Sequence, residues 1–228
     1  MSASAGPDLI TDGLVLYLDA ADTKSYPGSG NTWFDRVNES NTTLINSPTY
    51  VNDSGGAINF NQSNDYASTP WGANVNPYNN PISISCWFKI NALQSARLLF
   101  STGQTRGNGN LNQRLYFGTR TTSEFGWGIQ DSLWVSGEFS TPVDTNWHNV
   151  TIVIDSTNAR CYIDTILEDT KTVNSSYVLN DNLWLGAHNS ATTNNIDARV
   201  SNLHVYEKAL VQSEITQNYN AIKSRFQL

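Results

Sequence analysis

The stretch from residue 144 to residue 170 constrains the fold of this chain more than any other. A strand that begins at Trp147 carries apolar side chains at every second position, which is the pattern of a strand with one face in a core. The polar residues 155–159 supply a turn, residues 161–163 alternate again, and a second polar corner follows at residues 164–165. The segment therefore predicts an antiparallel meander.

Other short apolar runs bounded by turn residues indicate further strands. They lie at residues 14–19, 43–45, 57–60, 65–68, 82–90, 97–100, 114–117, 125–129, 133–135, 183–186 and 198–206. The run 82–90 alternates strictly, with Trp87 on the face opposite its isoleucines. Residues 57–60 and 65–68 flank a polar corner, and we expect them to form a hairpin. The Gly-rich residues 103–110 predict a mobile loop.

Near the C-terminus the apolar period changes from that of a strand to that of a helix. Apolar residues recur there at steps of four, three and four: Ile215, Tyr219, Ile222 and Phe226. This stripe predicts a helix over residues 212–224 that packs across the edge of the sandwich. Glu214 in its first turn agrees with the helix dipole. Val211 stands at the cap position, where it offers no side-chain acceptor.

Composition bounds the class of protein and its partners. Charged residues make up only 14% of the 228 positions, whereas neutral polar residues are abundant, which fits a many-turned β protein better than a helix bundle. A net charge of −7 without a Lys/Arg run argues against nucleic acid and anionic membranes as partners. No signal peptide or long apolar segment is evident. We expect one domain, residues 13–228, after a short arm, residues 1–12.

The two cysteines, Cys86 and Cys161, each lie in an apolar strand pattern. Such positions favour buried, reduced thiols, and a cross-strand disulfide is the alternative. Neither cysteine has the surroundings of a catalytic thiol.

Several sequence features together resemble one known family. They are the Trp147-His148 pair that opens the apolar strand, the corner at Asp164, the Asn64-Asp65-Tyr66 step and the segment 196–210. These features resemble the laminin-G-like group of concanavalin A-type lectin and glucanase domains, which implies an all-β jelly-roll sandwich. The family usually has Gly where this chain has Thr165, and without Gly a positive-φ turn is less favoured there.

The segment Glu214–Phe226 resembles the C-termini of such domains in structural proteins of tailed bacteriophages. The resemblance implies a non-enzymatic protein on the virion surface that decorates the capsid or belongs to a tail or fibre. The expected partners are virion proteins such as the major capsid protein and host-surface glycans, and a homo-oligomer is compatible with this role. A secreted or cell-surface carbohydrate-binding module is the first alternative.

A glycoside hydrolase of the same fold is the second alternative, but no catalytic residues are predicted. Retaining glycosidases need two carboxylates about 5 to 5.5 Å apart on one face. Glu168 and Asp169 are consecutive, so on a regular strand they would point to opposite faces. The three histidines are not accompanied by a Gly-x-Ser-x-Gly elbow.

Seven tryptophans suggest stacking against sugar rings, with core packing as the competing interpretation. Core packing is expected for Trp87, Trp147 and Trp184. Trp71 and Tyr78 lie in a polar loop, and Trp127 stands between two glycines whose bare backbone would leave the opposite sheet face open to a partner. Trp71, Tyr78 and Trp127 are therefore the predicted ligand-binding residues.

The resemblance also implies a structural calcium ion where the first and last strands meet, although no cofactor is required. Asp197, in the Ile-Asp step before the last strand, matches the family position best, with Asp19 and Asp22 as helpers. A hydrogen-bonded turn aspartate is the alternative at Asp197.

Overall fold

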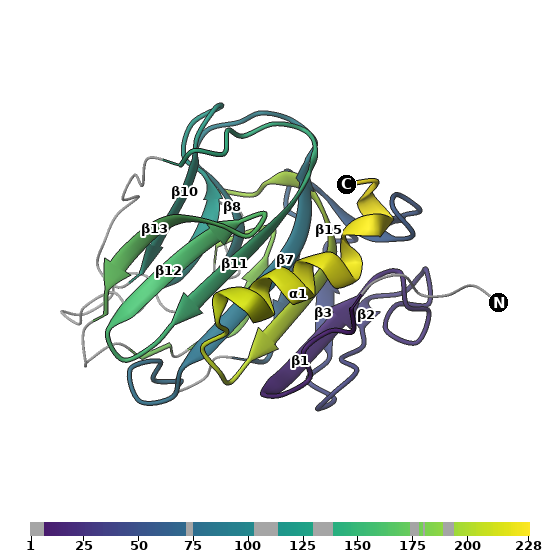
Figure 1. Ribbon diagram of the computed structural model, residues 1–228. Coiled ribbons are helices and arrows are strands. Elements are labelled where there is room, and N and C mark those ends of the chain that lie inside the picture. Colours follow the sequence, from purple (N-terminus) through teal and green to yellow (C-terminus); the bar gives the residue numbers. More distant parts are fainter. Residues whose placement is uncertain are drawn as a thin grey trace.

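The predicted strands form the two sheets of an all-β antiparallel sandwich with one short C-terminal helix (Figure 1). The computed structural model describes residues 7–71, 75–102, 114–129, 139–173, 178–179, 181–188 and 194–228. The predicted strand at 133–135, the predicted loop at 103–110 and residues 1–6 of the arm lie outside the described residues. The all-β prediction is confirmed.

Among the described residues the sandwich has an eight-stranded and a seven-stranded sheet. The eight-stranded sheet contains β1 (Leu14–Asp19), β4 (Thr49–Val51), β5 (Ala57–Asn61), β7 (Ile82–Ile90), β11 (Trp147–Ile154), β12 (Asn158–Ile163), β13 (Ile166–Thr172) and β15 (Asp197–Tyr206). The seven-stranded sheet contains β2 (Thr32–Trp33), β3 (Thr42–Ile45), β6 (Tyr66–Thr69), β8 (Arg97–Thr102), β9 (Leu115–Thr119), β10 (Phe125–Ile129) and β14 (Leu183–Leu185).

The strand order of the eight-stranded sheet is β13-β12-β11-β7-β15-β5-β4, with β1 also paired to β15. The strand order of the other sheet is β10-β9-β8-β14-β6-β3-β2. Strands β11, β12 and β13 are consecutive neighbours, so the predicted meander is confirmed. The apolar faces of both sheets meet in one core, in which the isoleucines of β7 pack against the phenylalanines of β8, β9 and β10.

The predicted hairpin between residues 57–60 and 65–68 is wrong. β5 pairs with β4 and β15, whereas β6 pairs with β3 and β14 in the opposite sheet. Phe60 and Ala67 therefore enter the same core from opposite sides. The alternating pattern is the same whether the chain turns back within a sheet or crosses to the other, so the pattern could not distinguish the two.

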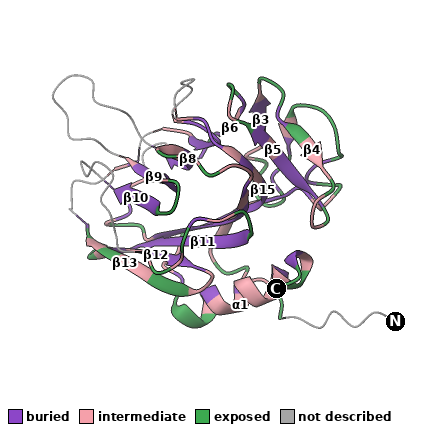
Figure 2. Ribbon diagram, turned by 90° about the horizontal axis from the view of Figure 1, so that it is seen from above, coloured by how far each residue is buried: buried purple, intermediate pink, exposed green. Residues whose placement is uncertain are grey.

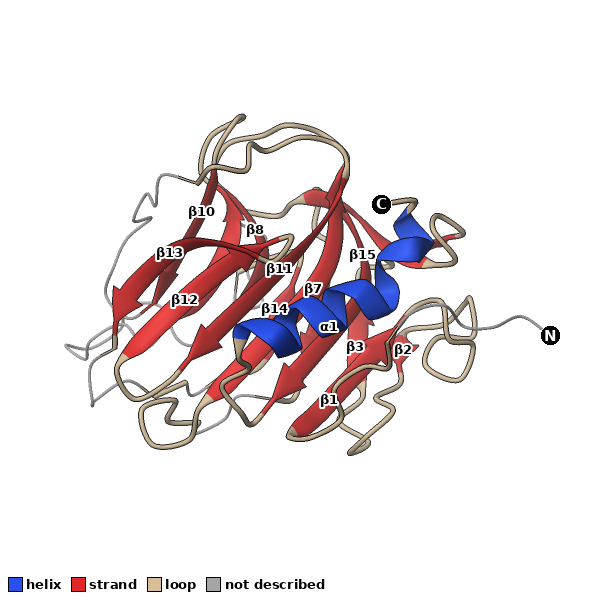
Figure 3. Cartoon of the chain, viewed as in Figure 1, coloured by secondary structure: helices blue, strands red, loops and turns tan. Residues whose placement is uncertain are grey.

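Helix α1 (Gln212–Ile222) and the 3-10 turn η1 (Lys223–Phe226) lie over the outer face of the eight-stranded sheet (Figures 1 and 3). The predicted stripe is correct, but it packs on this face and not across the sandwich edge. Phe226 stacks on Trp87 with ring centroids 4.2 Å apart and contacts Trp147 at 4.7 Å. Both faces of β7 are consequently buried, and Figure 2 shows α1 below β11 and β12. Neither described helix is long and apolar enough to span a membrane.

The missing cap at Val211 is compensated by Glu214. The Glu214 carboxylate accepts a hydrogen bond of 3.0 Å from the Val211 amide, which is one half of a capping box. Glu214 also pairs with Lys208 at 2.7 Å. The first turn of the helix is thus held without a capping side chain at its first position.

Cys86 and Cys161 are free thiols, fully buried on β7 and β12. Burial raises the pKa of both thiols, so they stay protonated. The prediction of reduced, structural cysteines is confirmed.

The corner between β12 and β13 keeps a positive-φ turn although this chain lacks the usual glycine. Asp164 and Thr165 have φ values of +49° and +74°, so this two-residue connection adopts positive φ at both positions although Gly is absent. The right-handed twist of the flanking strands favours such a turn. A β-branched residue with positive φ is strained, so Thr165 carries a local cost.

We predict that Thr165→Gly raises the free energy of unfolding by about 1 kcal/mol, because glycine adopts positive φ without the steric cost of a Cβ. Urea denaturation measures the change. Ser156→Gly is the control, since Ser156 lies in the preceding turn and is not among the positive-φ residues. It should lower stability through added freedom of the unfolded chain. A neutral or destabilising Thr165→Gly would contradict the strain argument.

Candidate functional site

The outer face of the seven-stranded sheet carries a transverse row of side chains. One residue from each of six neighbouring strands is in register: Thr43, Ser68, Trp184, Ser101, Tyr116 and Gly128. Their strand neighbours Leu44, Leu183 and Phe117 lie in the core, so this outer row points away from it. The two described helices cover the other sheet, so within the described chain this is the sheet face without a helix.

One end of the outer row combines an aromatic pair with neutral polar groups. Tyr66 lies two residues before Ser68 on the same face, and its ring centroid is 5.8 Å from that of Trp184. Asn182 donates a hydrogen bond of 2.9 Å to the Ser68 hydroxyl. Thr43 is exposed, and Tyr66 and Asn182 are half-buried. We call Thr43, Tyr66, Ser68, Asn182 and Trp184 together the Tyr66 platform.

The other end of the outer row is closed by the chain itself. Tyr116 is only 4% exposed and its ring lies across Gly128, where an added Cβ would come within 2.4 Å of the phenolic oxygen. The sequence predicts open space over the glycine backbone beside Trp127, and the Tyr116 ring fills that space at Gly128. At the platform end, Thr43, Tyr66 and Asn182 are accessible, whereas Ser68 and Trp184 are each 9% exposed.

The predicted ligand residues do not lie on this platform. Trp127 is fully buried, and its indole donates a hydrogen bond of 2.9 Å to Asp169 while the ammonium of Lys171 lies 4.6 Å from its ring centroid. Trp71 is 9% exposed in the main core, and Tyr78 packs against that core. Sugar binding by these three residues stays a prediction, and the structure does not bring them together on one open surface.

Trp184 is buried, as predicted, but it lies on the outer face of its sheet. Its neighbours Leu183 and Leu185 face the core, and strand alternation turns Trp184 to the outer face. The signal for Tyr66 was present in the sequence as the alternation of β6, in which Ala67 faces inward.

The two consecutive acids of β13 do not point to opposite faces. Cys161 pairs with Asp169 and Tyr162 with Leu167, which leaves Glu168 as the extra residue of a β-bulge. Glu168 accepts hydrogen bonds from the backbone and hydroxyl groups of residues 140–141, while Asp169 binds Trp127 and Lys171. Both acids therefore have internal partners beside β10.

Of the three predicted calcium ligands, Asp19 and Asp22 lie in one turn, whereas Asp197 is far from them. Asp19 pairs with Asn202, five residues along β15 from Asp197, which is a distance of roughly 16 Å. The described residues contain no group of three or more His, Cys, Asp or Glu side chains that could hold a metal. The three carboxylates therefore do not share one ion in this arrangement, and calcium binding at any one of them stays a prediction.

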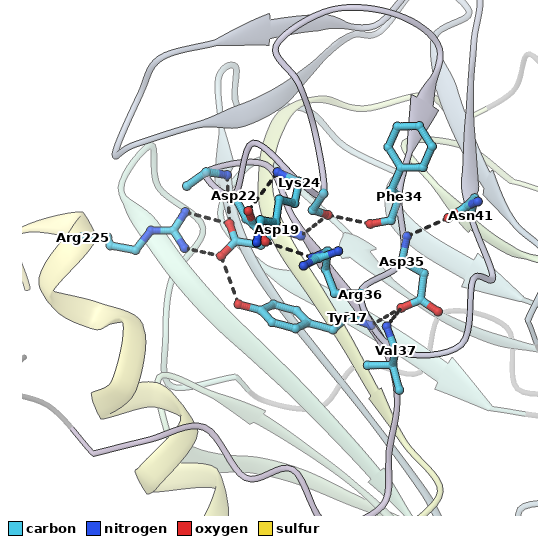
Figure 4. A network of polar contacts seen from close by, with 12 residues as sticks. Tyr17, Asp19, Asp22, Lys24, Phe34, Asp35, Arg36, Val37, Asn41 and Arg225 are labelled. Carbon is cyan, nitrogen blue, oxygen red and sulfur yellow. Dashed lines mark hydrogen bonds and ion pairs between the residues drawn. The ribbon is translucent and has the colours of Figure 1, made fainter.

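Each of the three carboxylates already has a protein partner. Asp19 accepts two hydrogen bonds from Arg225, at 2.9 and 3.1 Å, which tie η1 to β1 (Figure 4). Asp22 pairs with Arg36 at 3.1 Å, and Asp197 accepts a hydrogen bond of 2.7 Å from Asn91. The Asp19 carboxylate therefore already binds a cationic group, the guanidinium of Arg225.

The Trp147-His148 step positions a second charged cluster. His148 Nδ1 lies 2.6 Å from an oxygen of Asp164, and Nε2 lies 3.0 Å from an oxygen of Asp144. Burial alone would lower the pKa of His148, but the hydrogen bonds and negative charge of the two aspartates outweigh it and raise the pKa. Both ring nitrogens thus face carboxylate oxygens, and the ring joins the start of β11 to the Asp164-Thr165 turn.

Comparison with known proteins agrees with this geometry. Residues 61–216 match a laminin G family described as the concanavalin A-like lectin/glucanases superfamily. The match covers more than half of the chain, so the chain belongs to this superfamily. No curated protein matches the chain.

Solved structures share the fold at low identity. Trypanosoma rangeli sialidase in complex with sialic acid has a TM-score of 0.71 at 16% identity, over 99% of this chain and 35% of the sialidase. Domain 4 of AbnA, a GH43 extracellular arabinanase from Geobacillus stearothermophilus in complex with arabinotriose, has a TM-score of 0.68 at 17% identity, over 90% of this chain and 98% of that domain. The W1252A mutant of HCR D/C has a TM-score of 0.65 at 15% identity, over 92% of this chain and 52% of that chain. The protein thus spans about a third of the sialidase and nearly all of the arabinanase domain.

We predict that Arg225→Ala lowers the free energy of unfolding by about 2 to 3 kcal/mol, because it leaves the buried Asp19 carboxylate without its cation. Urea denaturation measures the loss. Arg36→Ala is the matched control, since the Arg36–Asp22 side chains are 35% and 34% exposed and such a pair contributes less than about 1 kcal/mol. Equal losses in the two variants would contradict the assignment of Arg225 as a buried anchor.

We predict a pH dependence that His148→Gln removes. Because the folded-state pKa of His148 is raised, its contribution to stability is complete below the unfolded value of about 6.5 and is lost as pH rises through the folded value. The wild-type free energy of unfolding should therefore fall as pH rises above about 6.5, and the variant should show a flatter profile. Urea titrations at a series of pH values test this, and parallel profiles would refute it.

Proposed function

We propose that this protein is a non-catalytic carbohydrate-binding domain and that it recognises a glycan on the Tyr66 platform. The observation that carries the proposal is the Tyr66–Trp184 ring pair beside the Ser68 hydroxyl and the Asn182 amide, on the sheet face without a described helix. Aromatic faces pack against the apolar face of a sugar, and neutral donors and acceptors meet its hydroxyls.

Two of the similar structures support this class of ligand, since the sialidase is in complex with sialic acid and the arabinanase domain with arabinotriose. Their low identity carries only the fold to this chain. The choice of a glycan therefore depends on the chemistry of the platform. The consecutive acids Glu168 and Asp169 of β13 both bind protein groups, which supports structural roles for them.

A place on a phage particle remains a narrower hypothesis. It depends on the C-terminal sequence pattern, and neither the matched family nor these three structures refer to a bacteriophage. A virion location is compatible with glycan binding, with major capsid protein and host-surface glycans as partners. Mass spectrometry of purified particles with copy numbers tests it, and absence of the chain from them would reject it.

We predict saturable binding to a subset of neutral glycans on an array of microbial and plant oligosaccharides. Tyr66→Ala should weaken the hits by about fivefold to tenfold, because it removes one sugar-stacking contact. Asn182→Ala should also weaken them through loss of a hydrogen-bonding group. Isothermal titration with the best array hit measures both effects.

Tyr78→Ala is the matched control, because Tyr78 is also a half-buried tyrosine but packs against the core. Its affinity should equal that of the wild type. Unchanged binding in Tyr66→Ala, or loss in Tyr78→Ala alone, would move the site to the loop that the sequence first suggested. No specific hit on the array would reject carbohydrate binding on this face.

A further inference from the structure

A pocket lies on the opposite side of the sandwich, where η1 ends against β7 and β11. Its volume is about 390 Å³, which is within the range of roughly 300 to 1,000 Å³ usual for small-ligand sites. Trp147, Tyr219 and Phe226 form an aromatic wall, and Asp53, Lys89 and Asp164 stand among its polar lining. We call it the η1 pocket.

The aromatic wall is rigid because its rings pack on one another. Phe226 lies between Trp87 and Trp147, with ring centroids 4.2 and 4.7 Å away, and Tyr219 stacks on Trp87 at 5.0 Å. These contacts hold the helix to the sheet and also fix the rings that line the pocket. A ligand would therefore meet an ordered apolar surface at little entropic cost.

The polar groups of the pocket retain hydrogen-bonding capacity. The Lys89 ammonium has three donors, and its ion pair with Asp53 is long, at 3.9 Å, because Arg199 holds the same oxygen at 2.5 Å. The oxygens of Asp164 accept from the Asn149 amide at 2.8 Å and face His148 at 2.6 Å, which leaves each oxygen with a further lone pair. Donors and acceptors thus stand together beside the aromatic wall.

Charged groups of both signs surround the pocket. Lys89 and Arg199 lie beside Asp53, and His148 lies between Asp164 and Asp144. A charged ligand of either sign would therefore meet like charge as well as opposite charge. A purely apolar ligand would leave the ammonium and the carboxylates without water or partners.

We propose that the η1 pocket binds a single neutral sugar unit through vicinal hydroxyl groups. One hydroxyl group of the sugar accepts a hydrogen bond from the Lys89 ammonium and donates one to a neighbouring carboxylate. The apolar face of the sugar ring packs on the aromatic wall. This site is separate from the Tyr66 platform, and its occupancy does not depend on glycan binding there.

The test titrates the full chain, labelled with ¹⁵N, with a panel of methyl glycosides of mannose, galactose, glucose and arabinose. The expected result is a saturable shift of the Trp147 indole and the Tyr219 amide with at least one glycoside, at millimolar Kd. Lys89→Met should weaken that binding at least tenfold, because it keeps the aliphatic stem and removes the ammonium. Lys24→Met, which changes an exposed lysine in the loop after β1, should bind as the wild type does.

Two further outcomes separate this site from the platform. Tyr66→Ala should leave these shifts unchanged, and Lys89→Met should leave array binding at the platform unchanged. The proposal is overturned if no glycoside gives a saturable shift at the pocket, or if Lys89→Met, with a folded spectrum, binds as tightly as the wild type. Failure of array binding alone would reject the platform and not the pocket.

Discussion

The packing of Phe226 against Trp87 and Trp147 is the contact on which the arrangement of the molecule depends. It holds the C-terminal helix over one sheet, so that β7 and β11 are buried on both faces. Arg225 adds a second anchor by binding Asp19 in the first strand, 206 residues away along the chain. The end of the chain thus closes one face of the sandwich and leaves the other sheet to present side chains outward.

This closure has a cost, because the covered face is not wholly apolar. The Asn202 side chain and the Nε2 atom of His204 are buried there without a hydrogen-bond partner among the described residues. Burial lowers the pKa of His204 to about 4, so its ring is neutral at pH 7. The unfolded chain would bind a proton first as pH falls below about 6.5, so this histidine destabilises the fold in acid. The aromatic stack and the Arg225 anchor must outweigh that cost.

Periodicity predicted most of the strands, the helix stripe and the free cysteines, because each depends only on local alternation and burial. It could not assign strands to sheets, which is why β5 and β6 were expected to pair. It also could not foresee that Tyr116 would fill the space beside Gly128, or that Arg225 would neutralise Asp19, because these contacts join distant segments. At Thr165 the two-residue turn of the meander imposes positive φ, although a β-branched residue disfavours that conformation.

The candidate site also depends on contacts between distant segments, which periodicity does not predict. Alternation places Tyr66 and Trp184 outward, but their proximity arises only because β6 and β14 become neighbours across a long connection. The two proposed sugar sites lie on the outer faces of different sheets. Because stacked sheets are about 10 Å apart and the helix adds to that thickness, no single short saccharide can occupy both. Simultaneous occupancy would need separate glycan chains, and affinity would then increase through multivalency only if those chains were linked in a suitable geometry.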